Sequence, residues 1–174
     1  MANTEEMLNI ALNYKPDIVT LVPEKRAELT TEGGLDVNAM KESLKKSIEL
    51  FRAEDIPVSL FIEPDKAAID ASKEVGADIV ELHTGSYAEK SDKQSKEKEL
   101  GRIVDASAYA SEIGLKVAAG HGLTDRNLGP IAAIKEMEEL NIGHALVSMA
   151  VFVGMEEAVK LYQTAILRAQ KLIN

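Results

Sequence analysis

Residues 115–124 read Leu115-Lys-Val-Ala-Ala-Gly-His-Gly-Leu-Thr124 and hold an apolar run, a histidine between two glycines and a helix-capping threonine. The run Leu115–Ala119 predicts a buried β-strand, and Thr124 can cap the helix that follows. The glycines on both sides of His121 let the backbone approach a ligand closely. The stretch therefore predicts a strand–turn–helix unit with a functional histidine in its turn. The alternative is a tight turn whose histidine bonds only to the backbone.

The same unit recurs along the chain. Four more apolar runs predict strands at 17–22, 57–62, 78–82 and 139–142. Helices are expected from Asn3 or Thr4 to Tyr14, from an Asp36 N-cap through Phe51, over 64–75, up to Ile113, over about 127–134, over 144–153, and in a last segment with a face through Ala158, Tyr162, Ile166, Ala169 and Ile173. Alternating strands and helices predict a parallel sheet with right-handed crossovers in one domain, 1–174. An open doubly wound sheet and part of a (β/α)₈ barrel both fit this pattern.

All three histidines follow predicted strands, and each has a glycine within two residues. They are His83, His121 and His144. The carboxyl ends of parallel strands share one face, which carries the chemistry of such folds. Because histidine titrates near neutral pH, this pattern predicts an acid–base or anion site. For His83, loop packing and a role in the site are equally good interpretations.

Further candidates lie beside these histidines. Glu81 stands in an apolar strand, where a carboxylate is costly unless it is functional or forms a structural ion pair. Gly122 and the pair Gly143-His144 follow the last two predicted strands, where free helix N–H groups suit a phosphate. A simple helix N-terminus is the alternative for Gly143. A zinc site built from the three histidines and Glu81 is conceivable, but the neighbouring glycines favour anion contacts.

Two charged segments are interpreted more simply. The loop from Pro23 to Leu35 is long for a strand–helix connection, which is typical of a lid or of a solvated surface loop. Residues 89–102 predict an exposed loop and a helix start.

Composition excludes several classes of function. The 174 residues carry a formal net charge of −9, which argues against a broad nucleic-acid surface. There is no cysteine, so thiolate chemistry and disulfides are excluded. No apolar stretch reaches the roughly 18 residues that span a membrane, and the acidic first residues lack a signal-peptide pattern. These features fit a cytoplasmic protein.

Six motifs together resemble the pyridoxine 5′-phosphate synthase family. They are Leu21-Val-Pro-Glu-Lys-Arg26, Thr30-Thr-Glu-Gly-Gly-Leu-Asp36, Val58-Ser-Leu-Phe-Ile62, Glu81-Leu-His-Thr-Gly85, Ala119-Gly-His-Gly-Leu-Thr124 and Leu140-Asn-Ile-Gly-His144. The resemblance implies a (β/α)₈ barrel that condenses 1-deoxy-D-xylulose 5-phosphate with 3-amino-2-oxopropyl phosphate. It also implies small phosphorylated substrates as the only partners besides copies of the chain, since the family forms octamers. No metal and no organic cofactor are implied.

The resemblance assigns roles residue by residue. His121 would donate a proton, and Glu81 would stabilise a transition state. Thr30 would contact substrate, and the substrate phosphate would be held by Gly122, Gly143 and His144. Ala118, Asp125 and Met149 depart from the residues common in the family, at positions near the phosphate and loop contacts.

The resemblance also implies that this chain lacks roughly the first three strands of a TIM-type barrel. Met1-Ala2 matches the residues just after a catalytic glutamate of the family, so the resemblance implies that this glutamate is missing here and that the activity of this chain alone is impaired. We therefore expect a partial barrel that associates with copies of itself, receives strands from a partner, or is a fragment of a longer protein. Another phosphate-binding barrel enzyme, such as an isomerase or aldolase, is the alternative within the same class. A non-catalytic phosphate-binding or assembly module is the alternative outside it.

Overall fold

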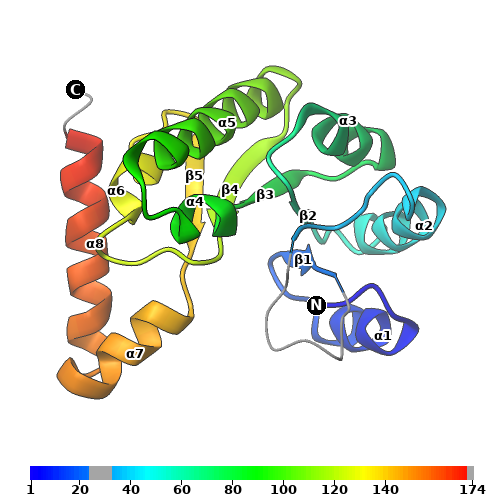
Figure 1. Cartoon of the computed structure of the whole chain (residues 1–174). Coiled ribbons are helices and arrows are strands. Elements are labelled where there is room, and N and C mark those ends of the chain that lie inside the picture. The colour runs from blue at the N-terminus through cyan, green and yellow to red at the C-terminus, as the bar shows by residue number, and fades with distance from the viewer. Residues whose placement is uncertain (24–32, 172–174) are drawn as a thin grey trace.

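The computed structural model describes residues 1–23 and 33–171 of the chain. Its strands form one five-stranded parallel sheet in the order β1-β2-β3-β4-β5 (Figure 1). Their bounds are β1 Val19–Leu21, β2 Val58–Ile62, β3 Ile79–His83, β4 Lys116–Gly120 and β5 Met137–Asn141. The predicted parallel α/β class is confirmed. In the described ranges the order starts at β1 and stops at β5, so the sheet is not closed into a barrel.

Helices connect the strands and cover the sheet. They are α1 Glu5–Tyr14, α2 Lys41–Arg52, α3 Lys66–Val75, α4 Gly85–Glu89, α5 Lys93–Glu112, α6 Leu128–Ala132, α7 His144–Val153 and α8 Met155–Lys171. Figure 1 shows α2, α3 and α5 along the outer side of the sheet, and α1 and α7 on either side of its lower edge. Ala2 forms an isolated parallel bridge to Val22, so the first residues also lie along β1.

Local capping explains several helix boundaries. Thr4 Oγ1 accepts a hydrogen bond from Met7 N–H at the start of α1, and Asp65 Oδ1 accepts one from Ala68 N–H at the start of α3. Gly76 ends α3 in the left-handed conformation with φ 91°. These boundaries agree with the sequence-based prediction.

Some predicted boundaries differ from the structure, among them those at Asp36 and His83. Asp36 does not cap α2, because its carboxylate closes a preceding turn by accepting from Ala39 N–H at 3.0 Å, and α2 begins only at Lys41. His83 is the last residue of β3 rather than part of the loop after it, because its pairing with Gly120 of β4 prolongs the strand. The charged segment 89–102 holds a short exposed loop and the start of α5 at Lys93, as predicted.

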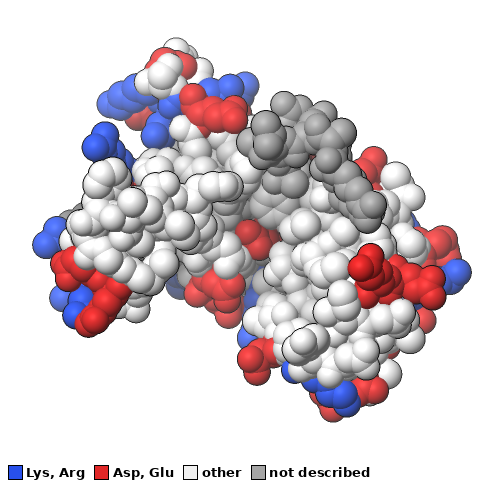
Figure 2. Space-filling model, turned by 90° about the horizontal axis from the view of Figure 1, so that it is seen from below, with Lys and Arg blue, Asp and Glu red and all other residues white. Residues whose placement is uncertain are grey.

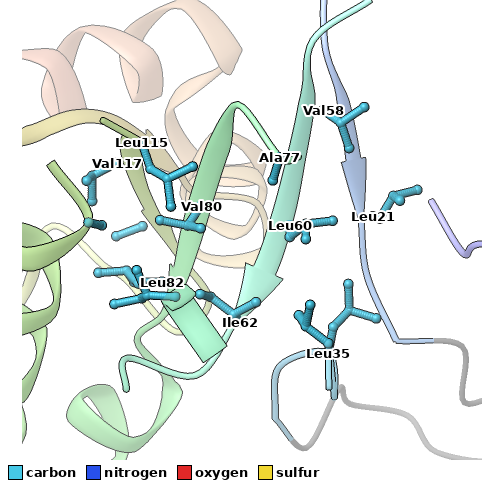
Figure 3. Close-up of a cluster of buried hydrophobic side chains, with 14 of the residues drawn as sticks. Leu21, Leu35, Val58, Leu60, Ile62, Ala77, Val80, Leu82, Leu115 and Val117 are labelled. Atoms are coloured by element: carbon cyan, nitrogen blue, oxygen red, sulfur yellow. The ribbon is translucent and has the colours of Figure 1, made fainter. Parts of the chain in front are cut away.

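The main hydrophobic core lies between the sheet and its outer helices. Alternate strand residues point to this side, and Figure 3 shows Leu21, Leu60, Ile62, Val80 and Leu82 packed together there. A second, smaller cluster joins α6 to α8 and contains Leu128, Ala132, Tyr162 and Ala169. The predicted face of α8 is confirmed as far as Ala169, and Ile173 lies outside the described residues. Because every second side chain of a strand points into this core, the side chains between them lie on the opposite face of the sheet.

Candidate active site

The opposite face of the sheet carries the polar residues of the strands in two rows. Register aligns Phe61, Glu81, Ala118 and Glu139 across β2 to β5. One step closer to the carboxyl ends, it aligns His83, Gly120 and Asn141. Figure 2 looks onto the lower side of the molecule and shows a hollow between two lobes, with carboxylates in it. The candidate side chains therefore gather at one end of one face of the sheet.

Glu81 is buried in the middle of this face, with only 8% of its surface exposed. Burial raises the pKa of its carboxyl, and the neighbouring carboxylate of Glu139 raises it further, while the side chain of Asn141 opposes the shift. A Cβ added at Gly120 would collide with Glu81 Oε1, so only glycine leaves room for this carboxylate. No Lys or Arg ion pair to Glu81 is found in the described ranges, so the structural ion-pair interpretation receives no support there.

Replacing Glu81 with glutamine is expected to stabilise the protein at neutral pH while lowering turnover about 10²-fold. The native state holds the Glu81 proton more tightly than the unfolded state does, so the wild-type free energy of unfolding falls as the pH rises above about 4.5. Glutamine carries no such penalty. Urea unfolding of both proteins between pH 4 and pH 8 measures this. A stability advantage of the variant that shrinks as the pH rises would contradict the assignment.

His83 lies behind Glu81 on the same strand and is also buried, with 7% exposure. Its Nδ1 is 2.7 Å from Glu63 Oε1, and this bond lowers the pKa of the Glu63 carboxyl. Its ring meets Phe61 edge-on at a centroid distance of 5.1 Å and His121 at 4.9 Å. His83 is therefore not a loop residue but part of a contiguous group around His121.

His121 sits in a strained turn directly after β4. Its φ is 81°, a conformation that side chains other than glycine rarely adopt, and Gly122 follows with φ 76°. Thr84, which is fully buried, holds this turn: its Oγ1 lies 2.8 Å from the carbonyl oxygen of Gly120 and 2.6 Å from that of His121. Asn127 adds a bond from its Nδ2 to the carbonyl of Gly122 at 3.0 Å. Strain supported in this way is typical of functional residues.

Replacing Thr84 with valine is expected to lower the free energy of unfolding by about 1–3 kcal/mol, since the turn carbonyls lose a buried donor. Serine at the same position keeps the hydroxyl and serves as the matched control. Chemical denaturation of both variants measures the difference. Equal losses for valine and serine would show that the methyl group, not the hydroxyl, holds the turn.

Burial and three neighbouring side chains change the pKa of His121. Burial is the largest cause that lowers the pKa of its imidazole, and the nearby imidazoles of His83 and His144 lower it further, while Glu89 in α4 raises it. A lowered pKa makes the protonated ring a stronger acid. His144 is thus close enough to His121 to lower its pKa, in agreement with the predicted site at the strand ends.

Gly143 and His144 stand at the N-terminus of α7, in the turn after β5. Gly143 is the N-cap residue, without a side-chain hydrogen bond, and both residues are exposed. This turn neighbours the Gly122 turn, because β5 pairs with β4. Free N–H groups at a helix start, next to a histidine, suit an anion. The structure therefore brings together His121, Gly122, Gly143 and His144, with Glu81 below them, whereas Thr30 lies outside the described residues.

Sequence reasoning missed three residues of this group: Glu63, Thr84 and Phe61. Glu63 directly follows β2, and Thr84 directly follows β3. Polar residues just beyond a strand end are therefore the signal that could have found these two. Phe61 looked like an ordinary core residue, because only the register shows that it faces the polar side.

Other places on the chain fit a ligand less well. No cluster of His, Cys, Asp or Glu able to hold a metal is found in residues 1–23 and 33–171. Nor does any helix of that part have the length and apolarity to cross a membrane. A hollow of about 540 Å³ lies at the amino ends of the strands. Its Arg52 and Lys73 already donate to the backbone carbonyls of Gly76 and Gly114, so these cations have structural roles.

The chain matches the family model described as "Pyridoxal phosphate biosynthesis protein PdxJ" over residues 1–168. It is 58% identical over 171 residues to "Pyridoxine 5'-phosphate synthase" of Sulfurihydrogenibium sp. (strain YO3AOP1), covering 98% of this chain and 70% of that protein. It is 57% identical to the protein of the same name from Thermodesulfovibrio yellowstonii, covering 92% and 66%. The chain thus spans about two thirds of the length of these relatives.

Solved structures with a similar fold are distant in sequence. The Amycolatopsis orientalis BexX/CysO complex gives a TM-score of 0.64 at 17% identity, covering 99% of this chain and 64% of that chain. KGPDC from Streptococcus mutans gives 0.58 at 13% identity, covering 97% and 69%. These neighbours are TIM-barrel-like, and at this identity they show the fold alone.

Proposed function

Since this chain belongs to the family of pyridoxal phosphate biosynthesis proteins PdxJ, we propose that it performs the synthase reaction for which its relatives are named. The reaction joins the amine of 3-amino-2-oxopropyl phosphate to the ketone of 1-deoxy-D-xylulose 5-phosphate. The imine forms with loss of one water, and the later steps, which close the ring with net loss of a second water and of inorganic phosphate, give pyridoxine 5′-phosphate. The supporting observation is the strained turn of His121, held by Thr84 beside the exposed N-terminus of α7.

Each residue of the site has a proposed role. His121, whose pKa is lowered by burial and by its neighbours, donates a proton in the elimination and ring-closing steps. The N–H groups of Gly122 and Gly143, together with His144, hold a phosphate and keep the reacting atoms in register. Glu81 stabilises the positive charge that develops on the imine nitrogen. Thr30 is proposed as a substrate contact from the resemblance of its motif.

We also propose that the whole chain forms one domain and that its sheet is part of a (β/α)₈ barrel that assembles with copies of itself in the cytoplasm. The apolar side chains of α7 support self-association, because this helix buries none of its residues within the described chain. Val151 is 79% and Phe152 88% exposed. Apolar patches of this kind are typical of protein interfaces.

The test is a turnover assay with both phosphorylated substrates, following release of inorganic phosphate and formation of pyridoxine 5′-phosphate by its absorbance. We expect product with the wild-type chain, and none above background when His121 is replaced. Binding of the substrates without any product would overturn the proposed activity and favour a phosphate-binding module.

A further inference from the structure

His83 is buried in a way that packing alone does not explain. Its Nδ1 is bonded to Glu63, but its Nε2 is fully buried and has no hydrogen-bond partner in the described ranges. An unpaired buried polar atom lowers the stability of the folded state. An apolar side chain at this position would carry no such cost. The polar ring nitrogens of His83 therefore indicate a role beyond filling space in the core.

The unpaired edge of His83 lies beside His121. The two rings meet edge-to-face at 4.9 Å. A Cβ added at Gly85 would lie 2.5 Å from His83 Nε2 and 3.1 Å from His121 Cδ2, so a glycine is needed for both rings to come this close. Phe61 closes the group from β2, at 5.1 Å from the His83 ring and 6.4 Å from the His121 ring.

The geometry points to Glu63 and His83 as a positioning pair for His121, in which the carboxylate orients the His83 ring and the His83 ring in turn orients the His121 ring as the proposed proton donor. This inference rests on the proposed function for its meaning in catalysis. Glu63 fixes the proton of His83 on Nδ1, in the manner of the carboxylates that orient histidines elsewhere. His83 offers no free ring nitrogen to a substrate, because its Nδ1 is bonded to Glu63 and its Nε2 is buried.

The side chains that affect the pKa of His121 include His83 but not Glu63. The groups facing His121 are His83 from β3, Glu89 from α4 and His144 from α7. Glu63 does not act on His121 directly: its partners are His83, Gly34 and, more weakly, Arg102. Removing the Glu63 charge should therefore change His121 only through His83. The direction in which the pKa of His121 changes therefore distinguishes an effect through His83 from a direct effect of Glu63.

The first test titrates the three histidines by NMR, following their ring C–H signals in the wild type, Glu63→Gln, His83→Phe and the control Glu89→Gln. The imidazole of His83 lowers the pKa of His121, and removing either that imidazole or the carboxylate bonded to it weakens this effect, so the pKa of His121 rises in His83→Phe and in Glu63→Gln. It falls in Glu89→Gln, where a direct carboxylate neighbour is lost. The double variant Glu63→Gln/His83→Phe shifts no further than His83→Phe alone.

Two outcomes would overturn the inference. One is a fall of the His121 pKa in Glu63→Gln, as expected if that carboxylate acted directly. The other is an unchanged His121 titration in a folded Glu63→Gln. Glu63 is partly exposed, so this variant keeps the test decisive even if His83→Phe does not fold. Neither outcome depends on turnover, so failure of the proposed function is recognised separately by the substrate assay.

The second test is kinetic. In Glu63→Gln we expect kcat to fall roughly 10-fold to 100-fold with KM nearly unchanged. The substitution alters the position of the His121 ring, which is the proposed proton donor, and leaves the phosphate site as it is. The limb of the pH–rate profile that reports His121 moves to higher pH. An equal loss in kcat and substrate affinity without a moved limb would show a merely structural role and overturn the assignment.

Discussion

Replacing His121 with asparagine is expected to lower kcat about 10²-fold to 10⁴-fold while phosphate binding stays measurable. General acid catalysis contributes an effect of this size, and an amide cannot supply the proton. Asparagine is the suitable replacement because φ at this position is 81°, and asparagine adopts that region more readily than most residues. The turn that presents Gly122 is then preserved, so the phosphate contacts remain.

Alanine at the same position gives the contrast. It removes the imidazole as asparagine does, but its Cβ disfavours a positive φ by about 1–2 kcal/mol. We therefore expect His121→Ala to lose stability and phosphate affinity as well as turnover. Steady-state kinetics, combined with calorimetric titration of inorganic phosphate into both variants, separates the two effects. If His121→Asn loses binding as completely as turnover, His121 shapes the turn and is not the proton donor.

Much of the fold could be predicted from local sequence, because residues close to each helix or strand determine where that element begins and ends. The strand predicted at 115–119 shifts by one residue in the structure, and the helices predicted from Asn3 or Thr4 to Tyr14 and over 64–75 are present as α1 and α3. Asp36 shows the limit of this reasoning. Its side chain can close any short turn that follows it, and nothing nearby in the sequence tells a single turn from the first turn of α2.

The candidate site was predictable in part, for a related reason. His121, Gly122, Gly143 and His144 carry their signal in the chain itself, as glycines beside a histidine after a strand. Glu63 and Thr84 act on residues that are 20 and 37 positions away in the chain. Such contacts depend on strand register, and register is set by pairings between segments that are distant in sequence. One step of register decides that His83 faces His121 instead of the helices.

Glycine 34 links this register to stability, and Gly34→Ala is expected to lower the free energy of unfolding by about 3 kcal/mol. Gly34 passes directly over the end of β2, where a Cβ would collide with the backbone of Ile62 and Glu63. Backbone atoms cannot rotate away as a side chain can. The bond from Leu35 N–H to the Phe61 carbonyl, at 2.8 Å, holds the two segments together at this point.

The matched control is Gly101→Ala in the middle of α5, where an added Cβ meets nothing within 4 Å. Alanine in a helix interior should raise stability by about 0.5–1 kcal/mol, so the same substitution acts with opposite sign at the two sites. Urea unfolding measures both. Gly34 N–H also donates to Glu63 Oε1 at 3.1 Å, so Gly34→Ala should disturb the His121 titration while Gly101→Ala leaves it unchanged. A Gly34→Ala protein within 0.5 kcal/mol of the wild type would mean that this segment does not lie against β2, and the placement of Glu63 beside His83 would lose its support.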